Sequence, residues 1–238
     1  MNWSVLGIWG TSGRNVFAVG SSGTIMRYNG RFWRTQASGT DGFLSGVWGS
    51  SGTDVFVAGG VAGSGKILHY DGRSWMTQHG PVPENLSGVW GSSGSDVFAV
   101  GADSILHYDG SAWSAQSSGT NAGLSSVWGS SGSDVFAVGG FGTIVHYNGS
   151  VWSVQTIGSG TDENLFGVWG SSGSDVFAVG AFGRILHYDG IRWSAQSSGT
   201  AEHLYAVWGR SRGDVFAGGS GGTMLHYDGS QWSAQSVK

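Results

Sequence analysis

The chain contains no cysteine, only two prolines and few charged residues. The absence of cysteine excludes disulfide bonds and thiolate metal ligands, and it is compatible with any redox compartment. Charged residues make up 11% of the sequence, against about 25% in an average globular protein. We therefore expect glycine, serine, threonine, asparagine and glutamine to form most of the solvent-exposed surface.

Cations are scarce in particular, because 11 Lys and Arg residues face 15 Asp and Glu residues, for a net charge of −4. Nucleic-acid and anionic-membrane surfaces need clustered cations, so we expect no nucleic-acid partner. No apolar stretch approaches the roughly 20 residues of a transmembrane helix, which predicts no membrane insertion. Residues 1–10 lack the features of a signal peptide. An extracellular or cell-surface location is nevertheless favoured, for a secreted parent whose leader was removed or a segment of a longer protein.

Glycine is abundant instead, with 46 of 238 residues, and it marks an internal repeat. The repeat reads L-x-G-V-W-G-S-S-G-S-D-V-F-A-V-G-x-x-G-T-I-L-H-Y-D-G-S-x-W-S-A-Q-S-S-G-T. Its first tryptophan recurs every 38 to 42 residues, at Trp9, Trp48, Trp90, Trp128, Trp169 and Trp208. A period near 40 with four short apolar runs predicts an all-β fold, a six-bladed β-propeller with four antiparallel strands per blade.

The whole chain, 1–238, is predicted to be a single propeller domain. Its blades are expected at residues 6–43, 44–85, 86–123, 124–164, 165–203 and 204–238. In the third copy the expected strands are Leu86–Gly91, Asp96–Gly101, Ser104–Tyr108 and Ala112–Gln116, with a hairpin turn at Asp109-Gly110. Runs such as Val-Phe-Ala-Val are apolar on both faces, as strands between neighbouring blades should be. The segment around Trp3 is interpreted as an extension or a seam plug.

Three motifs of the repeat carry a resemblance to known proteins. In the fourth copy they are Val127-Trp128, Ala137 through Ile144, and Asn148-Gly149 through Trp152. They resemble bacterial β-propeller repeats of the Asp-box (BNR-like) and photosystem II assembly-factor-like kinds. The usual Asp-box pattern S-x-D-x-G-x-T-W is reduced here to Tyr-Asp-Gly-x-x-Trp. The resemblance implies a propeller and leaves the function open, since it spans sialidases, assembly factors and surface repeats.

Repeated histidines and aspartates are interpreted as structural. A histidine precedes the Tyr-Asp-Gly or Tyr-Asn-Gly turn in five copies, at His69, His107, His146, His187 and His226. Each lies on a different blade, so they cannot meet the few ångströms that one metal ion requires. No metal is expected, and a repeated peripheral ligand site is the alternative. The aspartates after the Ser-Gly turn are expected to accept backbone N–H groups, as are those of the hairpin turns; they are Asp54, Asp96, Asp134, Asp175 and Asp214, then Asp71, Asp109, Asp189 and Asp228.

No catalytic motif stands out, so we expect no enzymatic activity and no cofactor. A sialidase needs three converging arginines, whereas only Arg184 lies near the expected mouth of a channel. G-x-S-x-G, phosphate-loop and H-E-x-x-H patterns are absent.

The copies differ mainly in two places, the connection between blades and the hairpin between second and third strands. Both are expected to open on one face, which resembles a binding surface built on loops. Aromatic side chains stand there where most copies have small residues, flanked by polar ones. The alternative is that these aromatics simply cover the ends of the blades. The predicted ligand-binding residues are Phe43, Asp103, Phe141, Glu163, Asn164, Phe166, Phe182, Arg184, His203 and Tyr205.

These observations favour a non-catalytic binding or scaffold module that holds a protein or glycan partner on its variable-loop face. One alternative is a multivalent lectin with a sugar site in each groove between blades. Another is a structural unit of a longer extracellular repeat protein. The chain is expected to be a monomeric ring or part of a longer chain.

Overall fold

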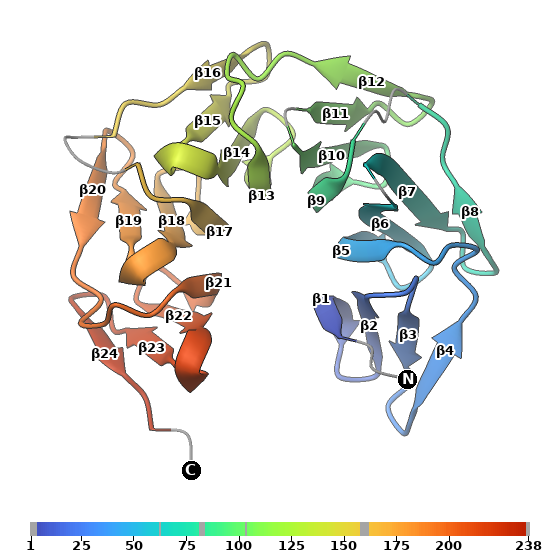
Figure 1. Ribbon diagram of the computed structural model, residues 1–238, viewed down its shortest axis with the longest axis horizontal. Coiled ribbons are helices and arrows are strands. Elements are labelled where there is room, and N and C mark those ends of the chain that lie inside the picture. The colour runs from blue at the N-terminus through green and yellow to red at the C-terminus, as the bar shows by residue number, and fades with distance from the viewer. Residues whose placement is uncertain (1–3, 62, 81–83, 103, 158–161, 237–238) are drawn as a thin grey trace. The chain divides into compact units, whose positions relative to one another are not determined.

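The computed structural model describes residues 4–61, 63–80, 84–102, 104–157 and 162–236 (Figure 1). The fold is a six-bladed β-propeller with four antiparallel strands in each blade, as the repeat predicts. The chain divides into two compact units of three blades each, Met1–Ser117 and Ser118–Lys238. Trp3 and Asp103 lie outside the described residues.

The first unit holds blades one to three. Blade one comprises β1 (Val5–Ser12), β2 (Asn15–Gly20), β3 (Ile25–Tyr28) and β4 (Trp33–Gln36). Blade two comprises β5 (Phe43–Ser51), β6 (Asp54–Val61), β7 (Ser64–Tyr70) and β8 (Trp75–Thr77). Blade three comprises β9 (Leu86–Ser93), β10 (Asp96–Gly101), β11 (Ile105–Tyr108) and β12 (Trp113–Gln116), within two residues of the predicted bounds.

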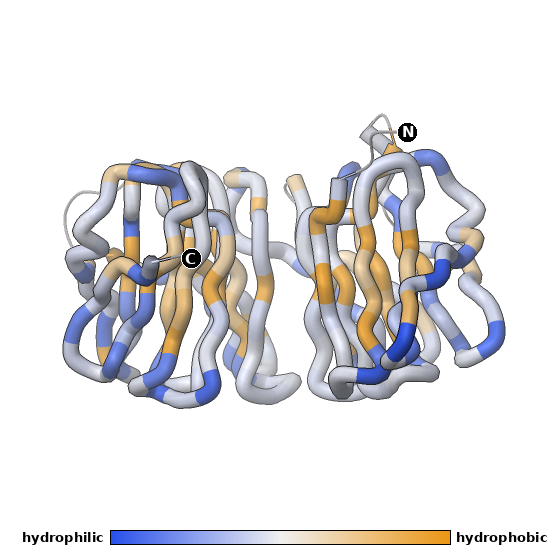
Figure 2. The backbone as a smooth tube through the Cα atoms, turned by 90° about the horizontal axis from the view of Figure 1, so that it is seen from below, coloured by the Kyte–Doolittle hydropathy of each residue, from blue (hydrophilic) through white to orange (hydrophobic). Residues whose placement is uncertain are grey.

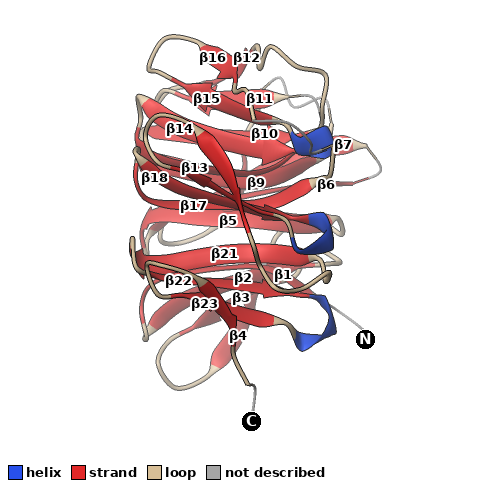
Figure 3. Cartoon of the chain, turned by 90° about the vertical axis from the view of Figure 1, so that its left-hand side faces the viewer, coloured by secondary structure: helices blue, strands red, loops and turns tan. Residues whose placement is uncertain are grey.

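The second unit holds blades four to six. Blade four comprises β13 (Leu124–Ser131), β14 (Asp134–Gly139), β15 (Ile144–Tyr147) and β16 (Trp152–Val154). Blade five comprises β17 (Leu165–Ser172), β18 (Asp175–Gly180), β19 (Ile185–Tyr188) and β20 (Trp193–Gln196). Blade six comprises β21 (Leu204–Ser211), β22 (Asp214–Gly219), β23 (Met224–Tyr227) and β24 (Trp232–Ala234). One-turn 3₁₀ helices follow the second strand of each: η1 (Gly140–Gly142), η2 (Ala181–Gly183) and η3 (Ser220–Gly222), seen as short helices among the strands in Figure 3.

In blades two to five the second strand forms the core, because it is paired on both sides and almost entirely buried. In blade five, Phe177 and Val179 are fully buried. They pack against Leu204, Leu225 and Trp232 of blade six. Figure 2 shows hydrophobic stretches along the middle of the strands and hydrophilic residues toward their ends. Burial of both faces explains why these strands read as continuous apolar runs rather than as an alternating pattern.

The hairpin between third and fourth strands has the predicted turn chemistry. In blade three, Asp109 Oδ1 accepts the backbone N–H groups of Ser111 and Ala112 at 2.9 Å each. The next residue, Gly110, has φ of 91°, a conformation that favours glycine. The expectation that the hairpin-turn aspartates accept backbone N–H groups is therefore confirmed here.

Candidate functional site

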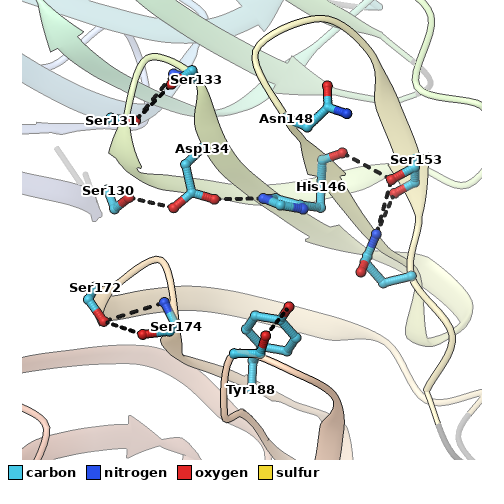
Figure 4. A network of polar contacts seen from close by, with 12 residues as sticks. Ser130, Ser131, Ser133, Asp134, His146, Asn148, Ser153, Ser172, Ser174 and Tyr188 are labelled. Carbon is cyan, nitrogen blue, oxygen red and sulfur yellow. Dashed lines mark hydrogen bonds and ion pairs between the residues drawn. The ribbon is translucent and has the colours of Figure 1, made fainter.

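A chain of three polar side chains, serine, aspartate and histidine, recurs in blades two to five. Blade six keeps the aspartate and the histidine, Asp214 and His226, and has Arg210 at the position of the serine. In blade four, the Ser130 hydroxyl donates to Asp134 Oδ2 at 2.5 Å, and His146 Nε2 lies 2.6 Å from Asp134 Oδ1 (Figure 4). The imidazole also stacks on Phe136, with ring centroids 4.1 Å apart. A carboxylate only accepts hydrogen bonds, so the serine and the histidine both donate to the aspartate.

This arrangement joins strands and does not activate a nucleophile. In a catalytic triad the histidine lies between the serine and the acid, where it can take the serine proton. Here Asp134 lies between Ser130 and His146, so the histidine cannot act as the base for that serine. The structure confirms that these histidines bond a neighbouring strand. The aspartate, expected to accept backbone N–H groups, is bonded to serine and histidine side chains instead, because pairing of the second and third strands brings the histidine within reach.

Blade one keeps this geometry with three different residues. Asn15 replaces the aspartate, and its Nδ2 donates to Thr11 Oγ1 at 3.1 Å. Arg27 replaces the histidine, and its Nε donates to Asn15 Oδ1 at 3.0 Å. The guanidinium lies 5.1 Å above the Phe17 ring, where the other blades stack an imidazole. The three substitutions keep both contacts, although the bond between the first two residues runs in the opposite direction, from the asparagine amide to the hydroxyl. This conservation of contacts supports a structural role for the whole chain.

The variable hairpins and connections of the second unit are joined by hydrogen bonds. The Phe141 N–H donates to Asn164 Oδ1 at 3.1 Å, and the Phe182 N–H donates to His203 Nδ1 at 3.1 Å. Asn164 and His203 each immediately precede the first strand of a blade, so they are equivalent residues. The two interactions attach the hairpin of one blade to the connection that leads to the next.

Both phenylalanines adopt a backbone conformation that is unusual for their type. Phe141 has φ of 55° and Phe182 has φ of 53°, in the left-handed region where a β-carbon is disfavoured. The equivalent residue of blade six is Gly221, with φ of 62°. Their side chains are 76% and 66% exposed. Neither turn geometry nor core packing accounts for an aromatic residue at this position.

Four of the predicted residues form one aromatic cluster in the second unit, here called the aromatic site: Phe166, Phe182, His203 and Tyr205. The His203 ring centroid lies 5.0 Å from that of Phe182 and 6.1 Å from that of Tyr205. Phe166 lies 5.4 Å from Tyr205 on the adjacent first strand. Phe182 and Tyr205 remain more than half exposed, so their rings offer apolar surface to a ligand.

An ion pair and a cavity adjoin this cluster. Arg184 Nη2 lies 2.5 Å from Glu163 Oε2, and its Nε donates to the same oxygen at 3.1 Å. Phe182 and Arg184 line an open cavity of about 500 Å³, together with residues 196–201. The S-S-G-T connection is not predicted from the sequence as part of a site, because it is nearly identical between copies and resembles a spacer. The sequence feature that points to this connection is Arg184, which replaces the consensus threonine of the repeat.

The four other predicted residues do not belong to this group in the described part of the chain. Phe141 and Asn164 bond to each other at the hairpin of blade four. Phe43 begins β5 in the first unit and is 61% exposed. Asp103 falls outside the described residues, so its predicted role stays a prediction. Glu202, one of the polar residues that flank the aromatics in the sequence, accepts the Ser220 hydroxyl at its Oε2 at 2.8 Å beside the aromatic site.

The described residues contain neither a cluster of metal ligands nor a membrane-spanning helix. Among those residues, no group of three or more histidine, aspartate or glutamate side chains could hold a metal ion. No helix of the described part of the chain has the length and hydrophobicity to cross a membrane.

Comparisons with known proteins show the fold. Neither a protein-family model nor a curated protein sequence matches this chain. The solved structure of YCF48 bound to D1 peptide matches with a TM-score of 0.75 at 16% identity, over 98% of this chain and 80% of that chain. YCF48 from Cyanidioschyzon merolae matches with a TM-score of 0.74 at 14% identity, over 99% and 88%. U3-55K matches with a TM-score of 0.80 at 12% identity, over 99% and 82%. Such likenesses confirm the propeller, and the resemblance to Asp-box repeats stays a prediction.

Proposed function

We propose that this chain is a non-catalytic binding module that holds a protein partner at the aromatic site. The observation that carries the proposal is Phe182, an aromatic residue kept exposed and in a left-handed conformation. Strained residues persist only where the surroundings hold them, and they concentrate at binding and active sites. A glycine at this position, as in blade six, would form the same turn without strain.

The chemistry around Phe182 suits an extended peptide segment. Exposed phenylalanine and tyrosine rings provide large contact area with few rotatable bonds, which is typical of interface anchors. The adjoining Arg184–Glu163 pair offers both a donor and an acceptor at the rim of the cavity. The solved YCF48 structure with a D1 peptide is an instance of a propeller of similar fold with a bound peptide.

Selection from a phage-displayed peptide library tests the proposal. Peptides selected on the wild-type chain are measured against Phe182→Ser and Tyr205→Ser by calorimetry. Truncating an anchor residue costs about 2 kcal/mol, so we expect a loss of about thirtyfold in affinity. Ile191→Ser is the matched control, because Ile191 is 87% exposed in a turn of blade five outside the aromatic site. It should bind as the wild type does.

A carbohydrate partner is distinguished from a protein partner with the same wild-type and variant chains. A glycan array that gives binding lost in Phe182→Ser, with no selected peptide, would replace the protein partner with a carbohydrate. Several equivalent glycan sites per chain, unaffected by Phe182→Ser, would instead favour the lectin with repeated grooves. Peptide binding that survives both cluster substitutions would contradict the proposal outright.

A further inference from the structure

A second cavity of the second unit adjoins the one at the aromatic site. It measures about 230 Å³ and lies between blades five and six, whose outer strands β20 and β24 are labelled in Figure 1. Its lining residues are Gln196, Ser197, Tyr227, Ser230, Gln231 and Trp232. Gln196 and Ser197 also line the larger cavity, which holds Phe182 and Arg184. Because the two cavities share this wall, a ligand at the aromatic site can extend from one into the other.

Tyr227 lines the second cavity with a hydroxyl that forms no hydrogen bond in the described part of the chain. In blade three the equivalent Tyr108 hydroxyl donates to the Gly110 carbonyl oxygen at 3.0 Å, and Tyr188 of blade five donates in the same way. Tyr227 is only 7% exposed. A buried hydroxyl without a partner costs free energy, so a bound group that supplies the missing hydrogen bond is favoured.

The other groups that line this cavity are polar and uncharged. Gln196 Oε1 accepts the Trp232 indole N–H at 2.7 Å, which leaves the Nε2 of Gln196 as a donor. The Ser230 hydroxyl donates to Asp228 Oδ1 at 2.7 Å, which leaves its oxygen as an acceptor. The exposed side chain of Gln231 can donate and accept. The cavity therefore offers donors and acceptors, and no charged residue lines it.

A side-chain amide matches this set of groups. It carries an acceptor oxygen and an NH₂ donor on one planar group, and it has no charge. A charged side chain would lose its hydration without meeting an opposite charge in the lining, which costs free energy. An apolar side chain would leave the Tyr227 hydroxyl without a partner. Asparagine and glutamine are therefore the residues that fit the cavity.

We propose that this cavity, here called the amide pocket, binds an asparagine or glutamine side chain of the peptide that contacts the aromatic site. This inference rests on the proposed function, because it names a second contact of the same partner. A peptide that reaches both sites has to pass the shared wall of Gln196 and Ser197. The hydrogen-bonding groups of the pocket reject partners that lack the amide, so they add specificity to the apolar contact.

Tyr227→Phe tests the pocket, because it removes one oxygen atom and keeps the ring. The probes are peptides selected by phage display on the wild-type chain, and calorimetry measures their affinity. We expect the selected sequences to carry asparagine or glutamine at a fixed distance from an apolar residue. Tyr227→Phe should lower their affinity about fivefold, the effect of one neutral hydrogen bond, and Gln231→Ala should lower it as well. Replacing the peptide amide with leucine should cost less affinity in Tyr227→Phe than in the wild type, because the two groups are in contact.

Tyr70→Phe is the matched control, at the equivalent position of blade two. The Tyr70 hydroxyl donates to the Gly72 carbonyl oxygen at 2.9 Å and accepts Arg27 Nη1 at 3.2 Å. Tyr70→Phe should therefore lower the unfolding midpoint and leave the peptide affinity unchanged. Tyr227→Phe should do the opposite, because its hydroxyl has no partner to lose among the described residues.

Failure of the amide pocket and failure of the proposed function give different results. Peptides that lose affinity in Phe182→Ser but bind Tyr227→Phe and Gln231→Ala as tightly as the wild type would overturn the amide pocket alone. Peptides whose affinity is unchanged in Phe182→Ser would overturn the proposed function and the amide pocket together. A library that yields no binding peptide would have the same consequence.

Discussion

At the residue scale, hydrogen bonds lower the pKa of the turn aspartates. The pKa of Asp109 is lowered from 3.8 to about 2, first by the hydrogen bond from the Ser111 hydroxyl and then by the N–H groups of Ala112 and Ser111. A lowered pKa in the folded state stabilises that state above the unfolded value. The contribution of Asp109 is therefore complete above about pH 4 and is lost as the pH falls from 3.8 toward 2.

We expect Asp109→Asn to remove this acid dependence while keeping the turn. Blade four supplies the precedent, because Asn148 Oδ1 accepts the N–H groups of Ser150 and Val151 at 3.0 Å each. Stability measured between pH 2 and 5 should fall less steeply for the asparagine variant than for the wild type. A carboxyl resonance of Asp109 that titrates near 3.8 in the wild-type NMR spectrum would contradict the argument.

Two buried tryptophans make it possible to separate the contribution of a hydrogen bond to stability from the contribution of packing. Trp232 Nε1 donates to Gln196 Oε1 of the preceding blade at 2.7 Å, whereas Trp193 Nε1 has no hydrogen-bond partner among the described residues. The indoles are buried to a similar extent, at 9% and 4% exposure. Trp232→Phe leaves the Gln196 oxygen without its donor, so it should destabilise the chain by about 1 kcal/mol more than Trp193→Phe. Urea unfolding of both variants checks this, and equal losses would show that the hydrogen bond contributes nothing.

At the element scale, the short hairpin carrying Phe182 combines local strain with exposure. We expect Phe182→Gly to raise stability by about 0.5 to 1 kcal/mol, because glycine adopts the left-handed conformation freely and only part of that gain is lost to the flexibility of its unfolded state. Phe182→Ala is the control, since it removes the ring and keeps the strain. Denaturant unfolding should rank the glycine variant above the alanine variant, and the reverse order would refute the strain argument.

Elements also show what could be predicted from the sequence and what could not. The four strands of each blade followed from apolar runs separated by Asp-Gly and Ser-Gly turns, which are local signals. The meeting of Phe182 with His203 depends on where the hairpin of one blade meets the connection to the next, so spacing alone predicted a shared face but no contact. The Ser130–Asp134–His146 chain was missed for a related reason. A turn aspartate has acceptable partners in its own backbone, and only the register brings the histidine within reach.

At the scale of the whole molecule, near-identical repeats hide unequal surroundings. In the sequence, blades one and six look like ordinary copies of the repeat. Val5 and Ile8 are conservative replacements of the consensus leucine and valine, and Trp208 is the consensus tryptophan. In a repeat protein each unit is stabilised chiefly by its neighbours, so position along the chain should decide the cost of a given substitution.

The same substitution in blades five and six tests that expectation. Phe177 and Phe216 each stack on a histidine, at 4.3 and 4.5 Å between centroids, but only Phe177 is fully buried. Phe177→Ala should cost about 3 to 5 kcal/mol, and Phe216→Ala about half as much in dilute solution. Thermal unfolding of both variants measures this difference. Equal costs would show that the two phenylalanines are buried alike in solution.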